Sequence, residues 1–94
     1  MIDDWLYISG LVHAYERKLP VEEDVYSDFY LPQGNVYIEF WGLENEAAYL
    51  KRKEVKKSIY AKYGYNLIEL TDSDIMNLDD ALPRILLKFG ISTE

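Results

Sequence analysis

The alternation of apolar and polar residues is clearest between residues 25 and 42. Two runs rich in β-branched and aromatic residues flank the turn residues Pro32 to Asn35, and this pattern predicts a β-hairpin with a loop of about four residues. Because successive side chains of a strand point to opposite faces, Asp28 and Glu39 each share a face with the aromatic residues two positions away. The predicted hairpin therefore carries one acidic side chain on each strand, among aromatic rings.

The rest of the chain shows other hydrophobic periods, from which the remaining elements follow. We expect a helix over residues 2–11, a strand over 12–19, a long helix over 44–62, a strand over 65–70, a helical turn over 72–78 and a helix over 79–89. The helix that follows the hairpin implies that the last strand pairs in parallel with the hairpin's second strand. The predicted fold class is α/β: a small mixed four-stranded sheet flanked by helices, in the order α-β-β-β-α-β-α.

The long helix is amphipathic only in part. Asn45 and its two flanking glutamates suit the positive N-terminal end of the helix dipole. A buried stripe is expected along one line of residues, namely Ala48, Arg52, Val55 and Ile59. Lys56 and Tyr60 lie about 80° and 120° from Ala48 on a helical wheel, on one shoulder of this stripe, whereas Lys57, at about 180°, and Lys53 are expected to face solvent.

Length and composition limit the classes of function. A chain of 94 residues with nearly half of them apolar and nine Tyr forms one folded domain over residues 1–94. Its first helix begins almost at Met1 without a capping residue, which is compatible with a domain cut from a longer chain. The absence of Cys excludes disulfides and thiolate chemistry, and a single His excludes most zinc sites. We expect no membrane span and no signal peptide, and a cytoplasmic location fits the Cys content.

The charge is unevenly distributed along the chain. The net charge is −7, yet residues 51–62 carry six basic residues against one acid, a local balance of +5. Such a ridge is either an ordinary solvated helix face or a contact surface for phosphates. The residues expected to contact nucleic acid in the second case are Lys51, Arg52, Lys53, Lys57 and Lys62.

The two hairpin acids are the candidate chemical centre. If the loop brings Asp28 and Glu39 to one side of the sheet, two like charges lie close together, which is unfavourable without a cation between them. A divalent cation held by hard oxygen ligands would compensate the repulsion. The alternative is that both are solvated acids on a half-exposed sheet.

The element order, an Asp on the second strand, a Glu on the third and a basic helix after them resemble the PD-(D/E)XK nuclease superfamily, whose fold is restriction-endonuclease-like. The segments that carry the resemblance are Ser-Asp-Phe-Tyr-Leu-Pro at 27–32, Tyr-Ile-Glu-Phe-Trp-Gly at 37–42 and Val-Lys-Lys-Ser-Ile-Tyr at 55–60. They are similar to nuclease segments of some superfamily 1 helicases and, more distantly, to very-short-patch repair endonucleases. The likeness covers about residues 5–70.

Two departures from the superfamily pattern stand out. Ser27 replaces the motif's structural Pro, and Trp41 occupies the position of the motif lysine, two residues after Glu39. The resemblance implies that a lysine of the following helix takes over this role, and Lys56 matches by position. An acid that superfamily members carry on the first helix would fall at or before Met1.

The resemblance implies hydrolysis of DNA phosphodiester bonds with Mg²⁺, or Mn²⁺ as the alternative cation. Asp28, Glu39 and the main-chain carbonyl of Phe40 would hold the metal, while Lys56, with Tyr60 beside it, would orient water or stabilise the transition state. Lys56 is then expected to pair with an active-site carboxylate when no metal is bound. Expected partners are DNA, a larger parent chain such as a helicase, or a second copy in a homodimer.

Two other classes of function stay open. A nuclease-like fold that no longer cuts would serve as a DNA-binding or protein-docking module, and Trp41 and the acidic net charge favour this reading. A pure protein-interaction domain would cover the basic ridge with a partner chain. The sequence does not distinguish DNA from RNA or endonuclease from exonuclease activity.

Overall fold

The computed structural model describes residues 2–42 and 47–91. The elements in chain order are α1 (Ile2–Ile8), β1 (Ala14–Lys18), β2 (Tyr26–Leu31), β3 (Val36–Trp41), α2 (Ala47–Tyr63), β4 (Asn66–Thr71), α3 (Asp72–Met76) and α4 (Leu78–Leu87). One sheet holds the strands in the order β1-β2-β3-β4. The first three strands are antiparallel neighbours, and β3 pairs with β4 in parallel. The α/β class and the parallel pairing are confirmed.

Two element boundaries differ from the prediction. Helix α1 ends at Ile8 and not at residue 11, because Gly10 adopts a left-handed φ of +74° and the Leu11 N–H donates to the Leu6 carbonyl, which closes the helix. Strand β1 is shorter than residues 12–19. The expected helix start at residues 44–46 lies outside the described residues.

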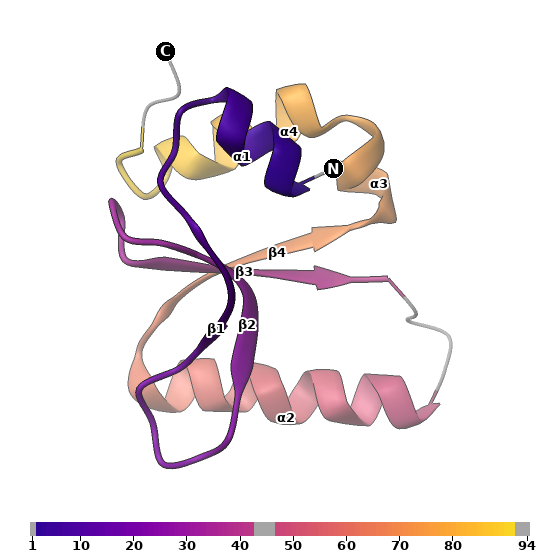
Figure 1. Cartoon of the computed structure of the whole chain (residues 1–94). Helices are drawn as coiled ribbons and strands as arrows, with labels where there is room; N and C mark the ends of the chain where they lie inside the picture. Colours follow the sequence, from indigo (N-terminus) through magenta and orange to yellow (C-terminus); the bar gives the residue numbers. More distant parts are fainter. Residues whose placement is uncertain (1, 43–46, 92–94) are drawn as a thin grey trace.

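The helices form two layers, one on each face of the sheet. Figure 1 shows α1, α3 and α4 on one face and α2 alone on the other. The larger core lies under α1 and α4 and includes Leu6, Phe29, Leu31, Val36, Ile38, Ile68, Leu70, Leu82 and Leu86. A smaller cluster of Leu19, Tyr37 and Tyr60 lies on the α2 face, with Tyr30 packed against it. The predicted alternation of the hairpin is therefore confirmed. No helix in the described part of the chain is long and apolar enough to cross a membrane.

Helix α2 contacts the sheet through a different stripe from the one predicted. Val55, expected in the buried stripe, is 55% exposed, and of that stripe only Ile59 is buried. The residues that face the sheet are on the shoulder, because Tyr60 is 2% exposed and Tyr49 accepts the Gly42 N–H with its hydroxyl. The physical reason is that the sheet face under α2 carries polar and aromatic groups, which bind tyrosine hydroxyls and lysine ammonium groups better than aliphatic side chains.

Strand pairing is interrupted on both sides of Asp28. The β2–β3 register runs from Leu31 and Val36 to Phe29 and Ile38 and ends there, one position before Asp28 would face Glu39. The β1–β2 register passes over the position of Glu16, whose φ is +50°. A left-handed conformation is unfavourable for a residue with a Cβ. The sheet therefore opens at the position where Asp28 lies.

Candidate active site

Asp28 bridges the two hairpin strands where their pairing ends. Its Oδ2 accepts the main-chain N–H of Phe40 at 2.7 Å. Glu39 faces α2, and the charge of Asp28 acts on it. Asp28 also lines a depression with Asp3 of α1, a helix on the opposite face of the sheet from α2 (Figure 1). The shared cation site that the sequence indicated for the two acids stays a prediction.

Glu39 is a buried carboxylate with two partners from α2. It is 1% exposed, the Lys56 ammonium lies 2.9 Å from both of its oxygens, and the Tyr60 hydroxyl donates to Oε2 at 2.6 Å. Lys56 and Tyr60 are four residues apart, so one turn of helix presents both to the same acid. Lys56 therefore forms an ion pair with one of the two hairpin acids, as expected, and that acid is Glu39.

Burial shifts the acid–base properties of this cluster. Burial raises the pKa of Glu39 to about 7, the hydrogen bonds from Tyr60 and Lys56 oppose this shift, and the charge of Asp28 adds to it. Burial, followed by the hydrogen bond to Glu39, raises the pKa of Tyr60. Tyr60 therefore remains a protonated donor at neutral pH, whereas Glu39 exchanges its proton near neutrality.

Trp41, which the resemblance puts at the position of the motif lysine, packs beside Lys56. Its ring centroid lies 5.9 Å from the Lys56 ammonium, within the range of a cation–π contact. Its indole N–H donates to Glu69 at 3.0 Å, and Glu69 pairs with Lys57 at 3.4 Å. The expectation that Lys57 faces away from the molecule is thus wrong, because the rotation of α2 brings Lys57 over β4.

Glu69 and Asp3 are acids near the site that the sequence did not single out. Glu69 is the residue of β4 in register with Glu39, and this follows only from the parallel pairing. Asp3 of α1 lines a depression of about 380 Å³ together with Asp28 and Phe40, although we expected the first-helix acid at or before Met1. Asp3 is already paired with His13 at 2.7 Å. Burial lowers the pKa of His13, but hydrogen bonds with Leu11 and Asp3 outweigh it and raise the pKa overall.

The donor atoms at this site suit a hard cation. Asp28 and Glu39 offer carboxylate oxygens, and Mg²⁺ usually binds one or two carboxylates and keeps several waters. Within residues 2–42 and 47–91, no three carboxylate, imidazole or thiol side chains gather at metal-binding spacing. The two acids and the main-chain carbonyl of Phe40 would therefore leave several coordination positions to water or a phosphate oxygen.

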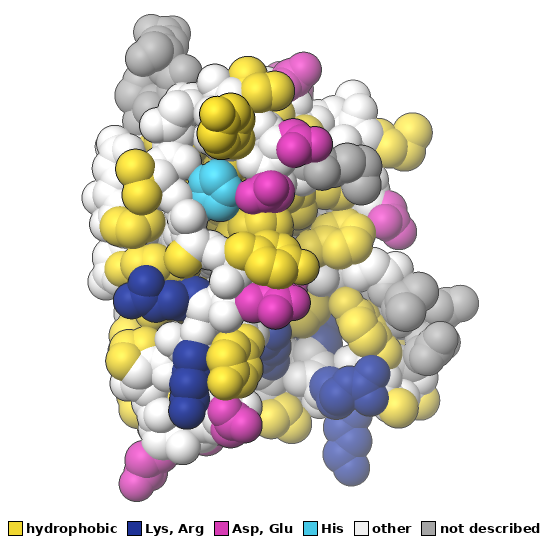
Figure 2. Space-filling model, viewed as in Figure 1, with side chains coloured by type: hydrophobic (Ala, Val, Ile, Leu, Met, Phe, Trp, Pro, Cys, Tyr) yellow, Lys and Arg dark blue, Asp and Glu magenta, His cyan; other side chains and the backbone are white. Residues whose placement is uncertain are grey.

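The five residues of the predicted nucleic-acid ridge fall into two groups. Four already contact groups of this chain: Arg52 lies 6.0 Å from the Tyr49 ring centroid, Lys53 lies 5.4 Å from the Trp41 ring centroid, Lys57 pairs with Glu69, and Lys62 pairs with Glu23 at 3.0 Å. The fifth, Lys51, is exposed, as is Arg52. Figure 2 shows Lys and Arg side chains in the lower half of the visible face, the half that contains α2 and the β1–β2 connection in Figure 1.

Comparisons with protein-family models, with curated proteins and with solved structures found no match to this chain.

Proposed function

We propose that this chain is a restriction-endonuclease-like nuclease domain that hydrolyses phosphodiester bonds of DNA with a divalent metal ion. The observation that carries the proposal is the cluster of Glu39, Lys56 and Tyr60 beside Asp28, at the point where β2 and β3 separate. A buried acid with a shifted pKa, a cation and an adjacent second acid are uncommon in a region that serves packing alone. The element order and the sheet topology support the same assignment.

In this proposal, Asp28, Glu39 and the Phe40 carbonyl would hold Mg²⁺ or Mn²⁺, and a cation at this place would supply Lewis-acid activation of the phosphate and of a bound water. Tyr60 fixes one oxygen of Glu39 through its short hydrogen bond. Lys56 pairs with Glu39 in the metal-free chain. Its ammonium group is therefore placed to stabilise negative charge that develops on the phosphoryl oxygens.

A test of the metal site is the replacement Asp28→Asn. We expect Mg²⁺-dependent cleavage to fall by about a hundredfold or more, because an amide carries no charge for the metal yet can still accept the Phe40 N–H and keep the hairpin intact. The measurement is cleavage of labelled single-stranded, duplex and branched DNA with and without Mg²⁺. Asp80→Asn, at an exposed acid of α4, is the matched control and should leave cleavage unchanged.

Cleavage that persists in Asp28→Asn with the same metal dependence would contradict the proposed metal site. Cleavage that is absent from the wild-type chain on all three substrates, with no Mg²⁺ or Mn²⁺ binding by calorimetry, would contradict the nuclease function itself.

A second candidate function is an inactive nuclease-like module that binds DNA or docks a protein. The observation in its favour is that both Glu39 oxygens already have partners and that a buried Trp41 occupies the motif's lysine position. Retention of the fold after Glu39→Gln, together with DNA binding that needs no divalent metal, would support this module.

The exposed cations of α2 lead to a separate prediction about DNA binding. Lys51→Gln combined with Arg52→Gln is expected to weaken DNA affinity and to lower its log–log salt dependence by roughly one unit per lost phosphate contact. Fluorescence titrations at several salt concentrations measure the slope. The matched control is Arg84→Gln with Lys88→Gln, which removes the same charge from the opposite face of the sheet. An equal decrease in both double variants would mean that the interface is not on α2.

A further inference from the structure

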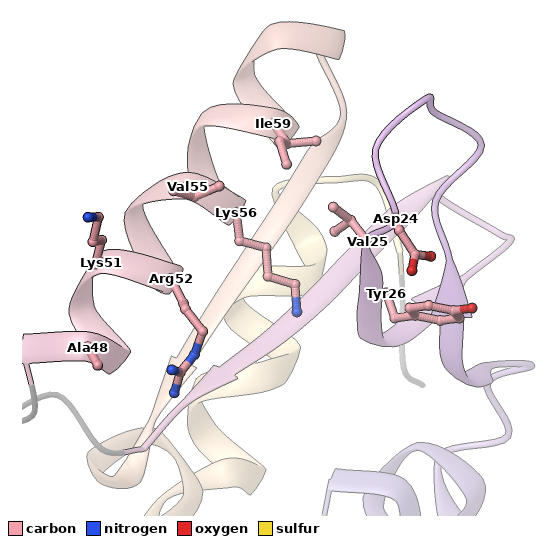
Figure 3. A pocket seen from close by; sticks show the side chains of 9 residues that line it. All are labelled: Asp24, Val25, Tyr26, Ala48, Lys51, Arg52, Val55, Lys56 and Ile59. Atoms are coloured by element: carbon pink, nitrogen blue, oxygen red, sulfur yellow. The ribbon is translucent and has the colours of Figure 1, made fainter.

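An open groove lies beside the candidate active site and is not explained by it. The groove has a volume of about 600 Å³ and runs between α2 and the segment that leads into β2. Figure 3 shows Lys56 reaching from α2 toward the wall that carries Val25 and Tyr26, whereas Arg52 points down along α2. Because Lys56 also pairs with Glu39, one side chain of the groove contacts the buried carboxylate.

Both walls of the groove expose apolar surface. Val55 of α2 is 55% exposed and Tyr26 of β2 is 50% exposed, and the other apolar residues of the lining are Val25, Ala48 and Ile59. This exposure follows from the rotation of α2, which presents its lysine and tyrosine shoulder to the sheet and leaves its aliphatic stripe open. Apolar side chains on both walls suit an occupant with an apolar face, such as a nucleobase.

The charge of the groove favours an anionic occupant. Three cations, Lys51, Arg52 and Lys56, line it, although the chain as a whole carries a net charge of −7. The acid in the lining is Asp24, whose carboxylate lies 3.7 Å from the Lys18 ammonium. The preferred occupant therefore combines a negative charge with a planar apolar face.

We propose that this groove binds unpaired nucleotides of the strand that is cut. An unpaired strand offers phosphates to the cations and base faces to the apolar walls at the same time, whereas a duplex keeps its base faces stacked inside and presents mainly its backbone. The proposal rests on the proposed nuclease function, because Lys56 joins the groove to Glu39. It assigns single-stranded segments as the substrate class.

The test uses the full chain in EDTA, so that binding is measured without cleavage. A fluorescein-labelled twelve-residue oligothymidine should bind at least about ten times more tightly than a hairpin duplex of equal length. Tyr26→Ala should weaken oligothymidine binding about fivefold or more, the low end of the cost of one lost base-stacking contact. Tyr26→Phe, which keeps the ring, should bind within about twofold of the wild type, as should Tyr7→Ala, at an exposed tyrosine of α1.

A second variant on the facing wall makes the test independent of Tyr26. Val55→Glu adds negative charge and removes apolar surface at an exposed helix position, so it should weaken oligothymidine binding by at least as much while the circular dichroism spectrum stays unchanged. Duplex binding as tight as oligothymidine binding, or unchanged binding in both wall variants, would overturn the proposal. The proposal would also be overturned if sedimentation velocity showed a dimer of the wild type and a monomer of Val55→Glu. The groove would then be an interface between copies of this chain.

The outcomes separate this inference from the proposed function. Selective oligothymidine binding without any metal-dependent cleavage would support the groove and contradict the nuclease. Metal-dependent cleavage without a preference for unpaired strands would support the nuclease and contradict the groove.

Discussion

Replacement of Lys56 by Met is expected to lower the rate of metal-dependent DNA cleavage by about a hundredfold or more, the usual effect of losing one group that stabilises the transition state. The Met side chain keeps most of the lysine stem beside Trp41 and removes only the positive charge that lies 2.9 Å from Glu39. Single-turnover cleavage at saturating Mg²⁺ measures the effect on the chemical step.

The fold is expected to tolerate this change. Without Lys56, the buried Glu39 would lose its cation, but the pKa of Glu39 is already raised to about 7, so the carboxyl group can take up a proton and keep its hydrogen bond with Tyr60. Lys57→Met, at a lysine paired with the half-exposed Glu69, is the control and should retain most activity. Cleavage that survives Lys56→Met but is lost in Asp28→Asn would show that the metal works without this lysine.

The second large effect concerns stability as a function of pH. The folded-state pKa of Glu39 is raised from 4.5 to about 7 by burial, so the folded chain holds this proton more tightly than the unfolded chain. The contribution to stability is therefore fully present below pH 4.5 and is lost as the pH rises through 7. With about 1.4 kcal/mol for each pH unit between the two pKa values, the loss at pH 8 is on the order of 3 kcal/mol.

Urea unfolding of the wild type and Glu39→Gln at pH 5, 6, 7 and 8 in EDTA measures this effect. As the pH rises, the free energy of unfolding of the wild type should fall relative to that of Glu39→Gln, because glutamine has no proton to lose. The pKa of His13 is also raised by its hydrogen bonds with Leu11 and Asp3, but its contribution is common to both proteins and cancels in the difference. Glu54→Gln, at an exposed position of α2, is the control. A difference that stays constant with pH would contradict the raised pKa.

The hairpin and the order of elements were predictable because their signals are local. Turn residues at Pro32 to Asn35 and a period of two residues on either side determine which side chains share a face, so the orientation of Glu39 toward the α2 face follows from the sequence. Lys56 could be placed because it lies one turn of helix from Tyr60 and follows an expected crossover. These inferences need only the geometry of one strand or one helix.

The orientation of α2 was not predictable in the same way. The helical wheel predicted that Val55 and Ala48 are buried because they are apolar. The sheet face beneath α2, however, presents Glu39 and tyrosine rings, which are complementary to Lys56 and Tyr60. Which stripe of a helix is buried depends on the surface it meets, and that surface forms from distant strands. The contribution of Glu69 likewise depends on the register between β3 and β4, which is a tertiary property.

The left-handed residue in β1 has a consequence for the association of copies. Strand β1 forms one edge of the sheet, and edge strands with regular main-chain groups recruit strands from other molecules and promote aggregation. Glu16, at φ +50°, breaks the regular row of donors and acceptors, and an incoming strand would have to desolvate the exposed charged side chains of Glu16, Arg17 and Lys18. We therefore expect intermolecular sheet growth to be blocked at β1, so that a homodimer of this chain would form through another surface.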